Sequence, residues 1–125
     1  MRNYSIAIIF IYISSLCNIL AANNDVKNTI KKAEDGLYTN PRQTVFLASK
    51  ALTKTNDKNN IVKLLFIKAM AERLLGNNDE SLYTLYKIDL DSFNQESSLK
   101  GEVYNLMSMC YCVLSDFQKA IELND

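Results

Sequence analysis

The chain has 125 residues and equal numbers of acidic and basic side chains, so its formal net charge at neutral pH is zero. It contains no histidine, only three glycines and one proline. The zero charge gives no overall field that would favour nucleic acid or acidic lipid, and the lack of histidine removes the commonest general acid–base group and metal ligand. So few turn residues also disfavour an all-β fold.

The first 22 residues form an apolar N-terminal segment. Arg2 supplies a positive charge, an apolar or weakly polar run extends from Tyr4 to Cys17, and small residues follow at Ala21 and Ala22. This layout is typical of a secretory signal peptide, with cleavage after one of the two alanines. We therefore expect residues 1–22 to be a signal peptide and residues 23–125 to be exported, to the periplasm or the cell envelope.

Two other interpretations of this segment stay open. The 19 residues from Tyr4 to Ala22 are long enough for an uncleaved anchor, because a helix rises ~1.5 Å per residue and a bilayer core is ~30 Å thick. Alternatively, Cys17 is a lipid attachment site, although Leu16 stands where a small residue is preferred. Both alternatives attach the chain to a membrane through residues 1–22 and keep the remainder outside the cytoplasm.

From Asn23 onward, the sequence predicts amphipathic helices separated by short polar segments. The first helix has one apolar face, made of Val26, Ile30, Ala33 and Leu37. The second begins with Asn40 as its cap and Pro41 in the first turn. Its apolar stripe is Val45, Ala48 and Leu52.

Four further helices are predicted. The third covers residues 60–75 and ends at Gly76, a common helix stop. The fourth covers residues 77–88, and its inward side chains are Leu82, Leu85 and Ile88. The fifth covers residues 99–114, and a break at Ser115-Asp116 separates it from a short sixth helix.

These helices form antiparallel pairs with a regular period. The breaks inside the pairs fall at Thr39-Asn40, Gly76-Asn77 and Ser115-Asp116, which are 37 and then 39 residues apart. Periods of this size are typical of helical solenoids, in which each pair buries its apolar face against its neighbours. We therefore expect an all-α fold.

The last pair resembles a tetratricopeptide repeat (TPR), a helix–turn–helix unit of ~34 residues. The residues that carry the resemblance are Tyr104, Met107, Ser108, Tyr111, the turn Ser115-Asp116-Phe117, and Ala120. The resemblance implies a right-handed α-α superhelix of about three helix pairs, of a divergent bacterial exported type. It also implies an incomplete last repeat, because the sixth helix has barely two turns.

The earlier units match the TPR pattern less closely. The middle unit, residues 60–90, has Gly76 at the turn and the small residues Ala69 and Ser81 at the helix crossing. Lys68 and Glu72 depart from the pattern, because the family places a leucine and an aromatic residue there. These departures put the register of the middle unit in question by one residue. The first unit, residues 24–55, keeps only Ala51 and the Asn-Pro turn.

The resemblance also implies a binding surface on the first helix of each pair, where the family holds proteins or peptides in a concave groove. Carried over by position, the groove residues are Lys63, Phe66, Met70, Arg73, Glu102, Asn105, Met109 and Cys112. The alternative is that these are ordinary exposed helix residues, or that they pack against further repeats. No cofactor or metal is expected, and the chain is not expected to be an enzyme.

Other residues that suggest chemistry have structural interpretations. Cys110 and Cys112 are two residues apart, so ~100° per residue turns them to nearly opposite faces of a helix, where they cannot share a disulfide or a metal ion. Inter-repeat packing, rather than base stacking, is the expected role of the tyrosines at positions 83, 86, 104 and 111.

The short sixth helix suggests that the chain is the exported beginning of a longer protein. Proteins with a signal, divergent repeats and Asn-Pro turns often continue into a transmembrane helix and a cytoplasmic kinase or DNA-binding domain. The alternative function is therefore the extracytoplasmic N-terminal sensor portion of a membrane signal-transduction protein.

Overall fold

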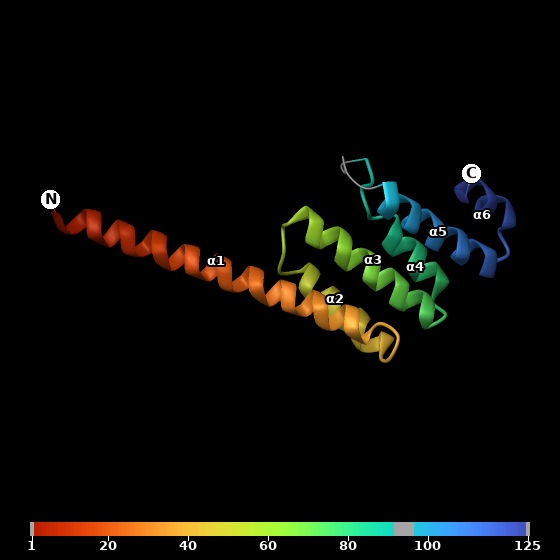
Figure 1. Ribbon diagram of the computed structural model, residues 1–125, viewed down its shortest axis with the longest axis horizontal. Coiled ribbons are helices and arrows are strands. Elements are labelled where there is room, and N and C mark those ends of the chain that lie inside the picture. The colour runs from red at the N-terminus through yellow and green to blue at the C-terminus, as the bar shows by residue number, and fades with distance from the viewer. Residues whose placement is uncertain (1, 92–96, 125) are drawn as a thin grey trace.

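The computed structural model describes residues 2–91 and 97–124, and this part of the chain is helical with no strand (Figure 1). The helices are α1 (Arg2–Gly36), α2 (Pro41–Leu52), α3 (Lys58–Leu74), α4 (Asn78–Leu85), α5 (Ser97–Val113) and α6 (Phe117–Asn124). Each helix packs against the next, and α3 also contacts α1 and α5. The first helices of the three pairs therefore form one wall of a stack, as the TPR-like fold requires.

α1 consists of two parts with different surroundings. Its apolar N-terminal part extends alone from the body of the molecule (Figure 1), and its side chains are exposed from Ile6 to Asp25. Its C-terminal part buries all four predicted inward residues, Val26, Ile30, Ala33 and Leu37. The helix expected to start near residue 23 is thus the continuation of the apolar segment, with no break between the two.

Capping residues set the ends of the middle helices. Asn40 caps α2, because its side-chain Oδ1 accepts a hydrogen bond from the backbone N–H of Gln43 at 3.2 Å, and Pro41 follows as expected. Asp57 caps α3 in the same way, because its Oδ1 accepts a hydrogen bond from the backbone N–H of Asn60 at 2.9 Å. Asn40 is the predicted cap of α2, whereas α3 begins at Lys58, two residues before the expected start, because Asp57 caps it.

The turns after α3 and α5 share one backbone motif. Gly76 has a φ of 82°, and the Asn77 N–H donates to the Glu72 carbonyl at 2.9 Å. Ser115 has a φ of 65°, and the Asp116 N–H donates to the Tyr111 carbonyl at 2.9 Å. Both are Schellman helix ends, which place a left-handed residue just after the helix. The two predicted breaks are therefore equivalent positions in successive repeats.

Small residues let the two helices of a pair approach closely. The Ser81 hydroxyl of α4 donates to the Ala69 carbonyl of α3 at 2.8 Å. The Thr44 hydroxyl of α2 donates to the Ala33 carbonyl of α1 at 3.0 Å, which is the equivalent contact one repeat earlier. In the third pair Ser108 is buried. The side chain of Ala120, its expected partner, lies outside the described residues. Ala69, Ser81 and Ser108 thus occupy the predicted crossing positions.

Two apolar clusters form the core. One joins α1, α2 and α3 through Val26, Ile30, Ala33, Ala48, Ala51, Leu64 and Ile67. The other joins α3, α4 and α5 through Val62, Leu65, Ala69, Leu82, Leu85, Ile88, Val103, Leu106, Met107 and Cys110. Because α3 contributes to both clusters, it is the element that connects the repeats.

The structure corrects the expected packing of α2. In α2, the inner positions belong to Thr44, Ala48 and Ala51, whereas Val45 and Leu52 are half-buried, so the helix is rotated relative to the predicted stripe. The bond from the Thr44 hydroxyl to α1 accounts for that rotation.

The tyrosines divide into packed and exposed residues. Tyr104 and Tyr111 pack against the second cluster, as predicted. The Tyr86 ring is exposed, but its hydroxyl lies 2.7 Å from that of Tyr111 and so connects neighbouring repeats. The prediction is wrong for Tyr83, which is exposed beneath the Lys87 ammonium, 4.1 Å from the ring centroid.

Lys68 and Glu72, the departures from the TPR pattern, form a polar network inside the middle pair. The Lys68 ammonium lies 2.7 Å from Glu72 Oε1, and the Thr84 hydroxyl of α4 donates to Glu72 Oε2 at 2.7 Å. The ammonium also donates to the Thr84 hydroxyl at 3.3 Å. An ion pair with a hydroxyl partner therefore replaces the apolar pair expected there, and the register of the unit is unchanged.

Candidate functional site

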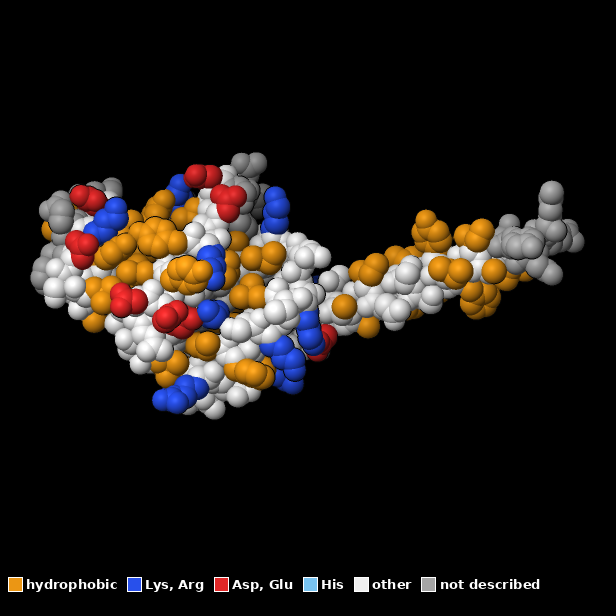
Figure 2. Space-filling view, turned by 180° about the vertical axis from the view of Figure 1, so that it is seen from behind, with side chains coloured by type: hydrophobic (Ala, Val, Ile, Leu, Met, Phe, Trp, Pro, Cys, Tyr) orange, Lys and Arg blue, Asp and Glu red, His pale blue; other side chains and the backbone are white. Residues whose placement is uncertain are grey.

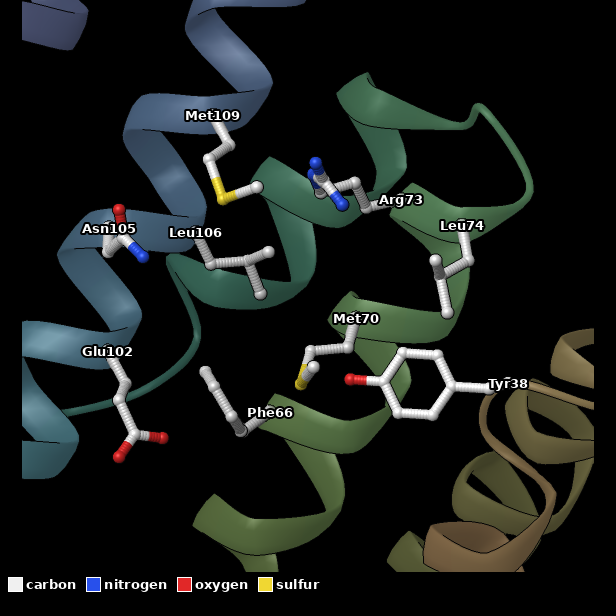
Figure 3. Close-up of a pocket in the computed structure, with 9 residues that line it drawn as sticks. All are labelled: Tyr38, Phe66, Met70, Arg73, Leu74, Glu102, Asn105, Leu106 and Met109. Atoms are coloured by element: carbon white, nitrogen blue, oxygen red, sulfur yellow. The ribbon is translucent and has the colours of Figure 1, made fainter.

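A groove between α3 and α5 is the candidate site, with a volume of about 290 Å³. Figure 3 shows its side chains projecting from both helices and from the α1–α2 turn. The residues that line it are Tyr38, Phe66, Met70, Arg73, Leu74, Glu102, Asn105, Leu106 and Met109. Two neighbouring helix pairs and the first turn thus contribute to one surface.

Helical spacing explains why these side chains face the same space. On α3, Phe66, Met70 and Arg73 follow one another at four and three residues, which is one stripe of a helix. On α5, Glu102, Asn105 and Met109 follow one another at three and four residues, which is also one stripe of a helix. Because α3 and α5 contact each other directly, the two stripes form the two sides of one groove.

The structure brings together six of the eight residues predicted for the groove. Lys63 and Cys112 do not line it. Lys63 is exposed on α3, three residues before Phe66, and Cys112 is exposed on α5, three residues after Met109. Each therefore extends its stripe past the groove, one at the beginning of α3 and the other at the end of α5.

Sequence reasoning missed three lining residues. Leu74 and Leu106 lie four residues after Met70 and Glu102, so helical spacing was a signal that could have found them. Tyr38 comes from the turn after α1 and is 74% exposed, although it lines the groove (Figure 3). Its position depends on how the first pair stacks on the second, for which the local sequence has no signal.

The groove combines an apolar lining with one charge of each sign. Phe66, Met70, Leu106 and Met109 contribute to its apolar lining, and the two methionines can adapt their shape to a partner. Glu102 is exposed on α5. Arg73 is half-buried, and its Nε is buried with no hydrogen-bond partner within the described part of the chain. Arg73 lines the groove and carries a positive charge, which would attract a bound carboxylate.

The cysteines differ in their surroundings. The Cys110 thiol is buried and donates to the Ser81 hydroxyl at 3.5 Å. Burial raises the pKa of this thiol, which keeps it protonated and unreactive. Cys112 and Cys17 are exposed, and all three cysteines are free. Among the described residues, no group of three or more metal-ligating side chains is close enough to hold a metal ion.

The sequence matches no family model, and no curated protein matches it. A solved structure has a similar fold, the crystal structure of the TPR domain of Arabidopsis FLU. The two chains are 15% identical, the similarity covers 82% of this chain and 90% of that chain, and the TM-score is 0.72. At this identity the likeness concerns the fold, and it establishes a TPR-like solenoid.

Proposed function

We propose that this TPR-like chain is an exported, non-catalytic scaffold that binds a segment of another protein in the groove between α3 and α5. The observation that supports the proposal is the groove itself, where apolar side chains from two helix pairs lie beside the charged residues Arg73 and Glu102. The likeness to a TPR domain supports the same role, because helical repeats present extended concave surfaces to partners.

The chemistry of the groove favours a short apolar segment with a carboxylate near one apolar side chain. Its volume of about 290 Å³ accommodates a few side chains rather than a folded domain. The apolar lining would hold an aliphatic or aromatic side chain, and the positive charge of Arg73 would attract a carboxylate of the segment. Glu102, on the opposite side, would favour a basic residue of the partner.

Export is proposed from the apolar N-terminal segment. α1 includes a stretch long and apolar enough to cross a membrane, and none of it is buried. A signal peptide and an anchor both fit this property. The second candidate function, the sensor portion of a membrane signalling protein, is favoured by one observation: α1 runs unbroken from the apolar segment into the core, so a change in the stack would reach the membrane through one rigid helix.

Two matched substitutions test the groove as a binding surface. Glu102→Lys reverses a charge in the groove, and Glu80→Lys makes the same change on the exposed side of α4. Tagged full-length variants are used to capture proteins from the native envelope, and each captured protein is quantified by mass spectrometry. We expect Glu102→Lys to reduce at least one specific partner by about tenfold, while Glu80→Lys matches the wild type.

A second substitution separates loss of binding from loss of fold. Asn105→Trp fills the groove at an exposed position, so it should block the partner without disturbing the core. Circular dichroism confirms that each variant keeps the wild-type helix content. Equal capture by the wild type, Glu102→Lys and Asn105→Trp would contradict the proposed function.

A further inference from the structure

The apolar part of α1 has no protein to cover it. Every described side chain from Ile6 to Ala22 is exposed, and an 18-residue window of this helix has a mean hydropathy of 2.0. Figure 2 shows this segment as an apolar arm that projects from the body. A helix of this composition in the core of a soluble protein would be largely buried. A bilayer is the environment that satisfies both its length and its composition.

The folded domain begins almost where the apolar stretch ends. Val26, which is 1% exposed in the core, lies four residues after Ala22, or about 6 Å along the helix axis. The helix continues through these residues without a break. With residues 4–22 in the membrane, the domain would therefore lie directly against the bilayer surface, with no linker between them.

Three lysines gather at this end of the domain. Lys32 on α1, Lys50 on α2 and Lys54 just after α2 line one shallow pocket of about 190 Å³, together with Asp25. The Lys54 ammonium lies 3.0 Å from Asp25 Oδ2. Figure 2 shows basic side chains where the arm meets the body. The lysines outnumber the single carboxylate of the pocket, so the pocket is positively charged.

Asp25 and its partner Lys54 lie at the depth of the lipid headgroups, and Lys32, which is about 10 Å further along α1, extends the basic surface away from the bilayer. Asp25 lies three residues after Ala22, about 4.5 Å beyond the end of the apolar stretch, and the headgroup layer is about 5–7 Å thick. The pKa of Asp25 is lowered, mainly by its hydrogen bond with Lys54 and further by the charges of Lys50 and Lys32. All three lysines therefore act on the same small region.

We propose that residues 4–22 are retained as a membrane helix, and that Lys32, Lys50 and Lys54 bind the phosphate groups of anionic lipids where the helix leaves the bilayer. This site is separate from the groove between α3 and α5 and uses none of its residues. It would fix the domain against the membrane and so set the direction in which the groove opens. If the groove binds no partner, the proposed lipid site is unaffected. If the lysines bind no lipid, the proposed binding in the groove is unaffected.

The first test is the mass of the full-length chain after expression in a host with a secretory pathway and purification from membranes. Retention of the N-terminal segment gives the full mass of 14.2 kDa. Loss of the first 21 or 22 residues would show a cleaved signal peptide and would overturn the proposal.

The second test measures lipid preference by native mass spectrometry of the full-length chain in detergent, with phosphatidylglycerol and phosphatidylcholine supplied in equal amounts. The wild type should retain phosphatidylglycerol preferentially. Lys32→Gln with Lys50→Gln should weaken that preference by about twenty-five-fold, at about fivefold per lysine. The control, Arg42→Gln with Lys119→Gln, removes the same charge from the starts of α2 and α6 and should stay within about twofold of the wild type.

Three results of the second test would overturn the proposal. They are no preference in the wild type, equal losses in the pocket variant and the control, and displacement of the lipid by millimolar inorganic phosphate. The last result would assign the pocket to dissolved anions, because free phosphate lacks the acyl chains that hold a lipid beside α1. The Lys54–Asp25 pair is left unchanged in both variants, so the loop after α2 keeps its contact with α1.

Discussion

Ser115 adopts a left-handed backbone conformation, with a φ of 65°, at the position where α5 ends. Glycine occupies this conformation at little steric cost, whereas a residue with a Cβ is disfavoured by about 1–2 kcal/mol. Gly76 is the equivalent residue one repeat earlier, with a φ of 82°. The two turns therefore differ in the strain of one residue.

We predict that Ser115→Gly raises the free energy of unfolding by about 1 kcal/mol and that Gly76→Ala lowers it by about the same amount. A Cβ at Gly76 would have no heavy atom within 4 Å, so backbone strain alone causes the predicted loss. Urea denaturation followed by circular dichroism measures both changes. A loss of stability in Ser115→Gly would show that Ser115 is not strained in solution.

Tyr111 titrates late because its hydroxyl shares a hydrogen bond with that of Tyr86 at 2.7 Å, which raises the pKa of Tyr111 to about 12 from an ordinary value of 10.0. Since the folded-state pKa is raised, the contribution to stability is complete below pH 10 and is lost as the pH rises toward 12. We predict that Tyr111→Phe removes the tyrosinate absorbance step near pH 12 and flattens the decline of unfolding free energy over that range.

The matched control for this titration is Tyr38→Phe. Tyr38 is 74% exposed, so its replacement should leave the late step unchanged. Loss of the late step in Tyr38→Phe, or its persistence in Tyr111→Phe, would contradict the assignment to the pair of tyrosines that connects α4 and α5.

The polar network between α3 and α4 is the main difference between the middle helix pair and the TPR pattern. Glu72 is 5% exposed, and both of its oxygens have partners, Lys68 and Thr84. Removing one member leaves a charge without its partner in a largely buried place, which is costly, whereas removing the whole network at once is often neutral.

We therefore predict that Glu72→Ala lowers the free energy of unfolding by about 3 kcal/mol. The triple variant Lys68→Met, Glu72→Met, Thr84→Val should stay within about 1 kcal/mol of the wild type, because apolar side chains of similar size replace every member. Chemical denaturation of both variants measures the difference. A triple variant as unstable as Glu72→Ala would show that the network is essential to the pair rather than replaceable.

The element boundaries could be predicted from the sequence because their signals are local. Asn40 and Gly76, which were expected to cap and to stop helices, act through contacts with residues three to five positions away. Asp57, which was not predicted as a cap, uses a contact of the same range. Helical spacing likewise predicted the buried face of α1, and the resemblance to the TPR family implied most of the groove. The rotation of α2 could not be predicted, because it depends on a bond between Thr44 and Ala33, eleven residues apart on another helix.

The same limit applies to the groove and to the polar network. Tyr38 lines the groove only because the first pair stacks beside α3, and no neighbouring residue indicates that position. In the sequence, Lys68 and Glu72 have the spacing of four residues that is common in ion pairs on a helix surface. Their burial depends on Thr84, which reaches Glu72 from the next helix. Contacts between distant segments therefore determine the details that the sequence pattern leaves open.

The whole molecule consists of a stack of three helix pairs, and the apolar part of α1 extends from this stack (Figure 1). The groove between α3 and α5 and the lysine pocket between α1 and α2 are formed by different residues. The proposed arrangement has one surface that faces a protein partner and another that faces lipid.

Site-specific photo-crosslinking in the native envelope tests the central claim, that the groove is the surface on which a partner protein binds. A photoreactive amino acid replaces Met70 or Asn105 in the groove, or Tyr83 on the exposed side of α4, in the full-length chain. If a partner binds in the groove, we expect a defined covalent adduct with another protein from the two groove positions and none from position 83. Adducts from position 83 alone, or from no position, would contradict it.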